Sequence, residues 1–300
     1  MPRQLVECVP NFSEGRDAAI IDAIVESIVS VGDVVLLDRG SDADHNRSVL
    51  TFVGPPAAVA EAALRSVEKA AALIDLTKQQ GEHPRIGAAD VGPFIPIEGV
   101  TLADCVALAE RVGHEIWNKL RIPVYFYEAA AKQPERVHLE NIRRGQFEAL
   151  LAEMPTIPER RPDVGDAACH PTAGATVVGA RKFLIAYNIN LGTADVGIAQ
   201  RIAKTVRFSS GGFRHVKAMG VLLASRNLAQ VSMNLTDFER TPIHVVFEAV
   251  RREAERYGVP VVGSEIIGLV PKKALEMAAG YFLRVENFSP DLVLENRMSL

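Results

Sequence analysis

The sequence predicts an α/β (α+β) protein built from two similar halves. Each half alternates short apolar runs with helical hydrophobic periodicity, in the order strand, helix, strand, strand, helix, strand. A proline-rich stretch at 153–174 lies near the middle of the 300-residue chain and interrupts this periodicity. The order in each half is that of the ferredoxin-like βαββαβ unit, in which two helices cover one face of a mostly antiparallel sheet. Two such subdomains would leave a cleft between them for a small molecule.

Local hydrophobic patterns predict the elements of the first half. Short runs rich in β-branched residues predict buried strands at 5–9 and 34–38, and alternation predicts a strand with one solvated face at 48–54. Two helices follow from apolar residues at helical spacing. These residues are Ile20, Ile21, Ile24, Ile28 and Val31, and then Ala60, Leu64, Val67, Ala71 and Ile74; a strand at 91–97, a helix at 102–120, a strand at 124–128 and a helix at 141–153 come after them.

The second half repeats the order. A strand is predicted at 182–190, and a helix follows on the apolar spacing between Val196 and Val206. Gly258 is a typical end for the second helix of this half. The other predicted elements are strands at 216–224 and 229–235, a helix carrying Val246, Val250, Ala254 and Tyr257, an extended segment at 259–270 and a short helix from Pro271.

Composition excludes several classes of protein. With 48% hydrophobic and 23% charged residues, the chain has the composition of a globular protein and not of a disordered one. Apolar runs such as 220–224 fall short of the ~20 residues that span a bilayer, and the N-terminus does not resemble a signal peptide, so we expect a cytoplasmic protein without a membrane partner. The spacing of Cys8, Cys105 and Cys169 predicts free thiols.

Charge is unevenly distributed along the chain. The net charge of −4 does not favour nucleic acid as a partner. The stretch 167–236, however, holds eight basic residues and a single acid, Asp195. Such a stretch indicates an anionic ligand or an interface, although a solvated basic face is an alternative.

His83 is the main candidate for a catalytic residue. It lies in a loop between a predicted helix and a predicted strand, and Gly81 and Gly87 flank it. Pro84 favours an extended backbone at His83, which fixes the direction of the imidazole. Imidazole is the side chain that changes charge near neutral pH without perturbation. The residues alone leave two interpretations, a proton-transfer group or a polar surface turn with an incidental histidine.

A second histidine, His45, shares a turn with Asp42 and Asp44. These side chains could ligate a metal, but their spacing matches no standard motif, and Asp-rich turns also form for backbone reasons. We therefore expect no metal, and a metal hydrolase built on these residues stays an alternative.

The segment 174–183 passes from a glycine-containing loop into a strand. Gly174 and Gly179 permit close approach of the backbone to a ligand, and Arg181 and Lys182 add positive charge. The segment lacks both the phosphate-loop and the dinucleotide-binding motifs, so nucleotide binding is not predicted.

Six segments of the chain resemble the glutamate formimidoyltransferase family, which includes the formimidoyltransferase half of the bifunctional formimidoyltransferase-cyclodeaminases. Each segment alone is a weak signal, but the ordered set is specific and spans almost the whole chain. The segments are LVECVPNFSEGRD (5–17), NRSVLTFVG (46–54), GEHPRIGAADVGPFIPI (81–97), GATVVGARKFLIAYNINL (174–191), NLAQVSMNLTDFE (227–239) and PVVGSEIIGLVPKKAL (260–275).

The resemblance implies two α/β subdomains, at 1–173 and 174–300, with a folate tunnel between them. It implies transfer of the formimino group from N-formimino-L-glutamate to N5 of tetrahydrofolate during histidine degradation, by a stand-alone homodimeric enzyme. Tetrahydrofolate would be a co-substrate and no metal would be needed. Motif matching assigns catalysis to His83 and folate contacts to Gly174, Ala175, Thr176, Val177, Val178, Gly179, Ala180, Arg181, Lys182, Phe183 and Gly220.

This reaction requires proton transfer between two nitrogens. N5 of the folate loses a proton as it attacks, and the departing glutamate nitrogen gains one, so an imidazole that titrates near pH 7 can act as base and then as acid. The carboxylates of formiminoglutamate and of the folate glutamate tail need cationic partners, for which arginine is well suited. We expect the substrate-binding residues to be Asp44, Asn46, Arg47 and Arg85.

Two features depart from the family pattern. Members often have Asp-x-Asp where this chain has Asp38, Arg39 and Gly40, so Asp42 or Asp44 would have to supply the second acid. The chain also ends at Leu300 without a cyclodeaminase half, so we expect a separate enzyme to consume the product. Two alternatives remain, a glutamate formyltransferase that uses N-formylglutamate and 5-formyltetrahydrofolate, and a non-catalytic folate-binding module.

Overall fold

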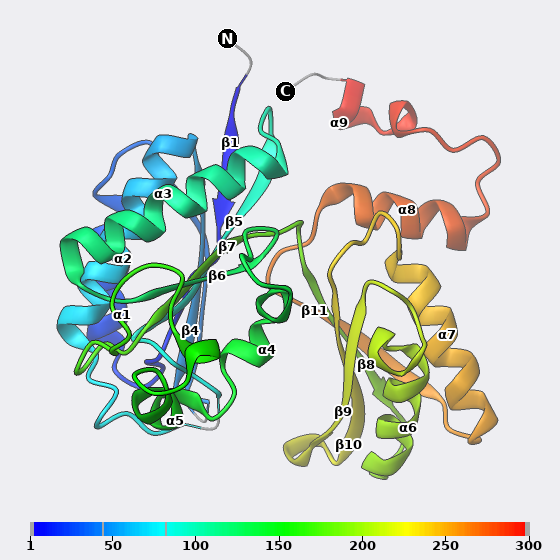
Figure 1. Ribbon diagram of the computed structural model, residues 1–300. Helices are drawn as coiled ribbons and strands as arrows, with labels where there is room; N and C mark the ends of the chain where they lie inside the picture. Colours follow the sequence, from blue (N-terminus) through cyan, green and yellow to red (C-terminus); the bar gives the residue numbers. More distant parts are fainter. Residues whose placement is uncertain (1–2, 44, 82, 298–300) are drawn as a thin grey trace. The chain divides into compact units, whose positions relative to one another are not determined.

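The computed structural model describes residues 3–43, 45–81 and 83–297 of the chain. The chain divides into a first unit, Met1–Lys182, and a second unit, Phe183–Leu300 (Figure 1). Each unit has its own β-sheet, and helices pack on each sheet, so the mixed α/β class predicted from the sequence is confirmed. The division between the units falls after Lys182, whereas 173/174 was the expected boundary.

The sheet of the first unit has the order β3-β4-β1/β2-β5-β7-β6 within the described residues. β1 and β2 lie in line between β4 and β5 and pair antiparallel with both. Pro10 separates them because proline has no N–H to donate to the ladder. The strands are β1 (Leu5–Cys8), β2 (Asn11–Phe12), β3 (Val35–Asp42), β4 (Arg47–Gly54), β5 (Ala89–Glu98), β6 (Val124–Glu128) and β7 (Thr176–Ala180).

Three helices cover one face of this sheet (Figure 1). They are α1 (Ala18–Val29), α2 (Pro56–Leu73) and α3 (Leu102–Leu120), and all three match the periodicity in the sequence. The side chain of Asp17 caps α1, and Thr101 and Asp104 form a capping box at α3. Buried residues from these helices and from the strands form the main core of this unit, among them Phe12, Ile24, Leu50, Phe52, Val59, Phe94, Val112 and Ile116.

A smaller core lies on the part of the sheet formed by β5, β6 and β7. Tyr125, Tyr127 and Val177 pack there against α4 (Leu139–Ile142) and α5 (Gln146–Glu153). One helix was predicted over 141–153, but the chain turns at Gly145, whose φ of 75° glycine adopts readily. The remaining elements here are two 3₁₀ helices, Pro134–Val137 and Pro158–Arg160.

β7 joins the first unit in a way that the sequence did not predict. It pairs parallel with β5 on one side and with β6 on the other, and all of its residues are buried. The backbone before it also pairs with the loop that carries His83, since Ala88 N donates to Ala173 O and Ala175 N donates to Ile86 O, both at 2.9 Å. The segment 174–180 therefore supports the loop of His83.

The second unit has a four-stranded antiparallel sheet of order β11-β8-β10-β9. Ile202 and Ala203 of the first helix and Val246 and Val250 of the second pack against it, as their spacing predicts. Within the described residues, no helix of either unit is long and apolar enough to cross a membrane. The elements are β8 (Ile185–Leu191), α6 (Val196–Val206), β9 (Val216–Leu223), β10 (Leu228–Leu235), α7 (Ile243–Arg256), β11 (Val261–Ile267), α8 (Lys272–Leu283) and α9 (Leu294–Arg297), with 3₁₀ turns at Phe208–Ser210, Ala224–Arg226 and Pro290–Leu292.

Substitution of Gly174 tests the packing between β7 and the loop of His83. The φ of Gly174 is +69°, and an added Cβ would overlap the carbonyl oxygen of Ile86. We expect Gly174→Ala to lower the free energy of unfolding by about 3 kcal/mol, since it combines strain with overpacking. The matched control is Gly40→Ala, because nothing lies within 4 Å of the added Cβ there. Denaturant titration measures both variants, and equal stabilities would contradict the account.

Candidate functional site

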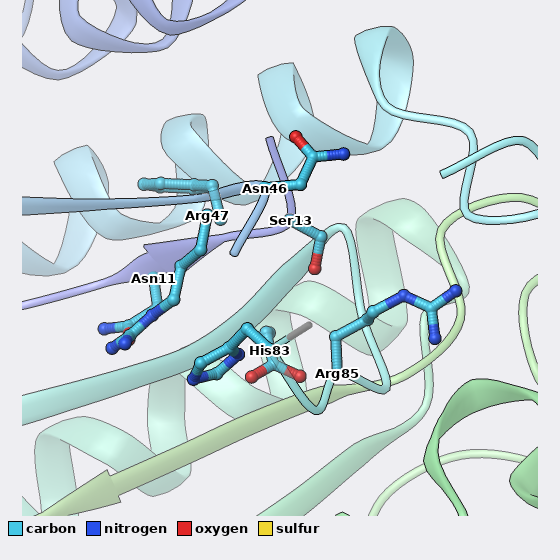
Figure 2. Close-up of a pocket in the computed structure, with 8 residues that line it drawn as sticks. Asn11, Ser13, Asn46, Arg47, His83 and Arg85 are labelled. Carbon is cyan, nitrogen blue, oxygen red and sulfur yellow. The ribbon is translucent and has the colours of Figure 1, made fainter. Parts of the chain in front are cut away.

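A pocket in the first unit contains His83. It lies where β2, the start of β4 and the loop before β5 meet (Figure 2). Most of its lining is polar or charged, as expected for a site that binds a polar ligand and not for a gap in the core. The lining residues are Asn11, Phe12, Ser13, Asn46, Arg47, His83, Arg85 and Asp90.

The loop of His83 is fixed on both sides. On its C-terminal side, the buried hydroxyl of Ser13 donates to Gly87 O at 2.7 Å, and Ser13 N donates to Ala88 O at 2.9 Å. On its N-terminal side, Asn46 holds the chain, because its side-chain amide donates to Gln80 O at 2.9 Å and its carbonyl oxygen accepts from Gly15 N at 2.9 Å. The side chain of Asn46 is thus occupied with holding the loop.

Asp90 ties this loop to a second segment. One of its carboxylate oxygens accepts a hydrogen bond from Ile86 N at 2.7 Å, and the other pairs with the guanidinium of Arg143. Arg143 lies in the connection between α4 and α5. Because Asp90 is buried and shielded from water, the guanidinium of Arg143 stabilises its negative charge.

Cationic groups surround the imidazole of His83. The pKa of His83 is lowered from 6.5 to about 3. Burial is the largest cause, the charges of Arg47 and Arg143 and a smaller effect of His45 act in the same direction, and Asp90 opposes them. His83 is therefore neutral at physiological pH in the protein alone. This differs from the expectation that the imidazole of His83 titrates near pH 7.

Arg47 is one of the two pocket arginines that the sequence analysis selected, the other being Arg85. Its guanidinium donates to Asn11 Oδ1, and its side chain extends towards the side of the pocket that holds the imidazole (Figure 2). Burial lowers the pKa of Arg47 to about 10, and the nearby charge of Arg143 acts in the same direction. Arg47 thus stays protonated at neutral pH in a position where an anion would stabilise it.

The family follows from comparison with known proteins. Residues 5–181 match the model of the formiminotransferase domain, N-terminal subdomain, and residues 186–298 match that of the formiminotransferase domain. The chain belongs to the formiminotransferase family. Its resemblance to this family, stated from six sequence segments, is confirmed.

Two relatives of this formiminotransferase chain are similar to it over almost their whole length, and a third over about half of its length. A glutamate formimidoyltransferase of Streptococcus pyogenes serotype M1 is 48% identical over 98% of this chain and 99% of that protein. One of Thermoplasma acidophilum is 45% identical over 98% of this chain and 97% of that protein. A formimidoyltransferase-cyclodeaminase of Mus musculus is 48% identical over 93% of this chain, but the match covers 52% of the mouse protein.

Arg85 has a different environment from the one expected of a substrate-binding residue. Its Nε and Nη2 donate to the side chain and backbone of Gln79, and its Nη groups also donate to Gln146 and Glu148, at 2.7 to 3.2 Å. These bonds use all five N–H groups. Figure 2 shows the guanidinium directed away from His83.

The segment expected to contact folate lies largely inside the first unit. Side chains of Val177 and Ala180 are 0% exposed, and Thr176 Oγ1 donates to Ala89 O at 2.9 Å. Within the segment, Arg181 is partly exposed and Lys182 exposed. In the second unit, Phe183 packs beside the core, and Gly220 lies so close to the backbone of α6 that a Cβ would overlap it.

The predicted acidic turn is only partly visible. Asp44 lies outside the described residues. Asp42 holds His45 through two contacts, to His45 N at 2.9 Å and to Nδ1 at 2.7 Å. In the part of the chain that the structure describes, no three His, Cys, Asp or Glu side chains form a metal-binding group. Cys8, Cys105 and Cys169 are free thiols.

Sequence reasoning missed four polar residues of the site. Asn11, Ser13 and Asp90 lie in the matching segments 5–17 and 81–97, so that resemblance was an available signal. Arg143 lies among charged residues outside those segments, and nothing in the sequence separates it from its neighbour Arg144.

The protonation state of His83 can be measured directly. We expect NMR titration of labelled histidine, with the His83 signal assigned by its loss in His83→Gln, to show a neutral ring from pH 8 down to pH 5. Since the unfolded chain protonates this ring near 6.5 and the folded one near 3, His83 should reduce stability as the pH falls through that window. A midpoint near 6.5 in the folded protein would contradict the account.

A second test concerns the role of Arg85. We expect Arg85→Met to lower the free energy of unfolding by about 2 kcal/mol, because Gln79 is buried and would lose its partner, while the exposed Glu148 would return to water. Arg144→Met is the control, since Arg144 is exposed. Unchanged stability together with a raised KM for substrate would instead indicate direct substrate binding by Arg85.

Proposed function

We propose that this protein is a glutamate formimidoyltransferase, which transfers the formimino group from N-formimino-L-glutamate to N5 of tetrahydrofolate. The observation that carries the proposal is a pocket lined by both His83 and Arg47, in a chain 45% and 48% identical over 98% of its length to proteins of that name. Like them, the chain is an enzyme that transfers one-carbon groups. Tetrahydrofolate serves as a co-substrate.

The neutral ring of His83 accounts for the proton movements. N5 of the folate attacks the formimino carbon, a new N5–C bond forms, and His83 accepts the proton that N5 loses. The bond from that carbon to the glutamate nitrogen then breaks, and the imidazolium returns the proton to the departing nitrogen. No net proton is consumed, and the products are 5-formiminotetrahydrofolate and glutamate.

Substrate binding adjusts this ring for its task. A base with a pKa near 3 accepts a proton poorly from an attacking nitrogen. The carboxylates of formiminoglutamate bring negative charge to Arg47, and this charge offsets the repulsion that lowers the pKa of His83. The imidazole thus becomes a stronger base when the substrate is bound.

The finer assignments are further proposals. Arg181 and Lys182, whose side chains reach the surface, bind the folate glutamate tail, and the backbone near Gly174 and Gly220 contributes contacts.

The strand orders β5-β1-β4-β3 and β11-β8-β10-β9, each built from a βαββαβ succession, support ferredoxin-like subdomains. The ligand tunnel, the homodimer and use in histidine degradation follow from the family resemblance, and free thiols support a cytoplasmic location.

An assay with both substrates tests the function. Purified protein with formiminoglutamate and tetrahydrofolate should form 5-formiminotetrahydrofolate, and formylglutamate should react far more slowly. Absence of product would reject the proposal, and preference for formylglutamate would favour the formyltransferase alternative.

His83→Ala tests the mechanism. We expect kcat to fall by ~10²- to 10⁴-fold with little change in KM, because a proton-transfer group acts mainly in the transition state. The exposed His138 supplies the control His138→Ala, which should retain activity. A kcat near that of the unmodified enzyme in His83→Ala would remove this residue from the mechanism.

A further inference from the structure

Arg143 pairs with Asp90, one of the residues that line the pocket, and comes from a part of the chain that no sequence motif marks. Its side chain is 14% exposed, and the carboxylate of Asp90 with which it pairs is 3% exposed. The segment that carries it is attached to the loop of His83, because Phe147 N donates to Arg85 O at 2.9 Å and Glu148 pairs with the Arg85 guanidinium at 2.8 Å. These contacts fix where the guanidinium of Arg143 lies relative to His83.

Both arginines beside His83 have a donor without a partner. Nε of Arg143 and Nε of Arg47 are buried, and neither has a hydrogen-bond partner among the described residues. A buried N–H without an acceptor is unfavourable, and binding of a ligand or a water molecule would satisfy it. Arg85 gives the contrast, since its five N–H groups are all used within the protein.

We propose that Arg143 is a second substrate-binding residue, which together with Arg47 binds a carboxylate of formiminoglutamate beside His83. This proposal rests on the proposed function. A guanidinium matches a carboxylate through paired N–H donors, so two neighbouring arginines with unused donors suit a dicarboxylate. Asp90 holds Arg143 in place and also holds the loop of His83 through Ile86, so the binding group and the catalytic ring share one anchor.

Distance within the substrates favours formiminoglutamate over the folate tail as the source of the carboxylate. In formiminoglutamate, only the amino nitrogen and the α-carbon separate the formimino carbon from the α-carboxylate. In folate, the p-aminobenzoyl group separates N5 from the glutamate carboxylates. A carboxylate next to the imidazole that serves N5 therefore belongs to formiminoglutamate.

Steady-state kinetics of Arg143→Gln test the assignment. We expect KM for formiminoglutamate to rise by about 10- to 100-fold, as for a lost hydrogen bond to a charged group, with KM for tetrahydrofolate within about twofold. Arg143→Lys keeps the charge but loses the paired geometry, so its effect should be intermediate. The exposed neighbour supplies the matched control, Arg144→Gln, which should change neither value.

A double variant distinguishes loss of substrate binding from misfolding. Arg143→Gln leaves Asp90 buried without its cation, whereas Asp90→Asn combined with Arg143→Gln removes that charge and keeps an oxygen that accepts from Ile86 N. The double variant should fold and still show the raised KM for formiminoglutamate. A normal KM in this variant, or a rise in KM for tetrahydrofolate alone, would overturn the proposal.

Thermal shift with formiminoglutamate alone separates this inference from the proposed function. If the unmodified protein gives no transfer product but is stabilised by formiminoglutamate, and the double variant is not stabilised, the function fails and the binding assignment stands. If formiminoglutamate stabilises both proteins equally, or neither, the assignment of Arg143 is wrong.

Discussion

The buried carboxylate of Asp90 connects the parts of the site on which the chemistry depends. One oxygen accepts from Ile86 N, three residues after His83, and the other pairs with Arg143 from the connection between α4 and α5. A single side chain thus holds both the loop that carries the imidazole and a cation whose charge lowers the pKa of that imidazole. Because both partners are largely buried, removal of either would leave an uncompensated charge in the interior.

Burial and positive charge together keep His83 neutral. These effects would make the ring a weak base if nothing else entered the pocket, but the proposed substrate carries two carboxylates. The same arginines would then bind the substrate and, once neutralised, release the imidazole from their repulsion. Binding and proton transfer are coupled because one set of charges serves both, and the ring acquires its basicity only where the formimino group is present.

Local patterns predicted most of the fold, and contacts between distant segments account for what they missed. The helices α1 to α3 follow hydrophobic spacing, and the loop of His83 was identified from Gly81, Pro84 and Gly87. β7 was taken for a loop leading into the next strand, since nothing in its own residues reveals pairing with β5 and β6. Likewise, Arg85 differs from Arg47 in its partners, which include Gln146 and Glu148 from a distant segment.

The most direct test of this account is the pKa of His83 measured by NMR with and without formiminoglutamate, in the absence of folate so that no transfer occurs. The account predicts that the pKa of His83 is near 3 in the free protein and that it rises clearly towards neutral pH when the dicarboxylate is bound. Glutamic acid diamide, which lacks both carboxylates, should leave it unchanged. A pKa that does not respond to bound formiminoglutamate would contradict the proposed coupling between the arginines and the imidazole.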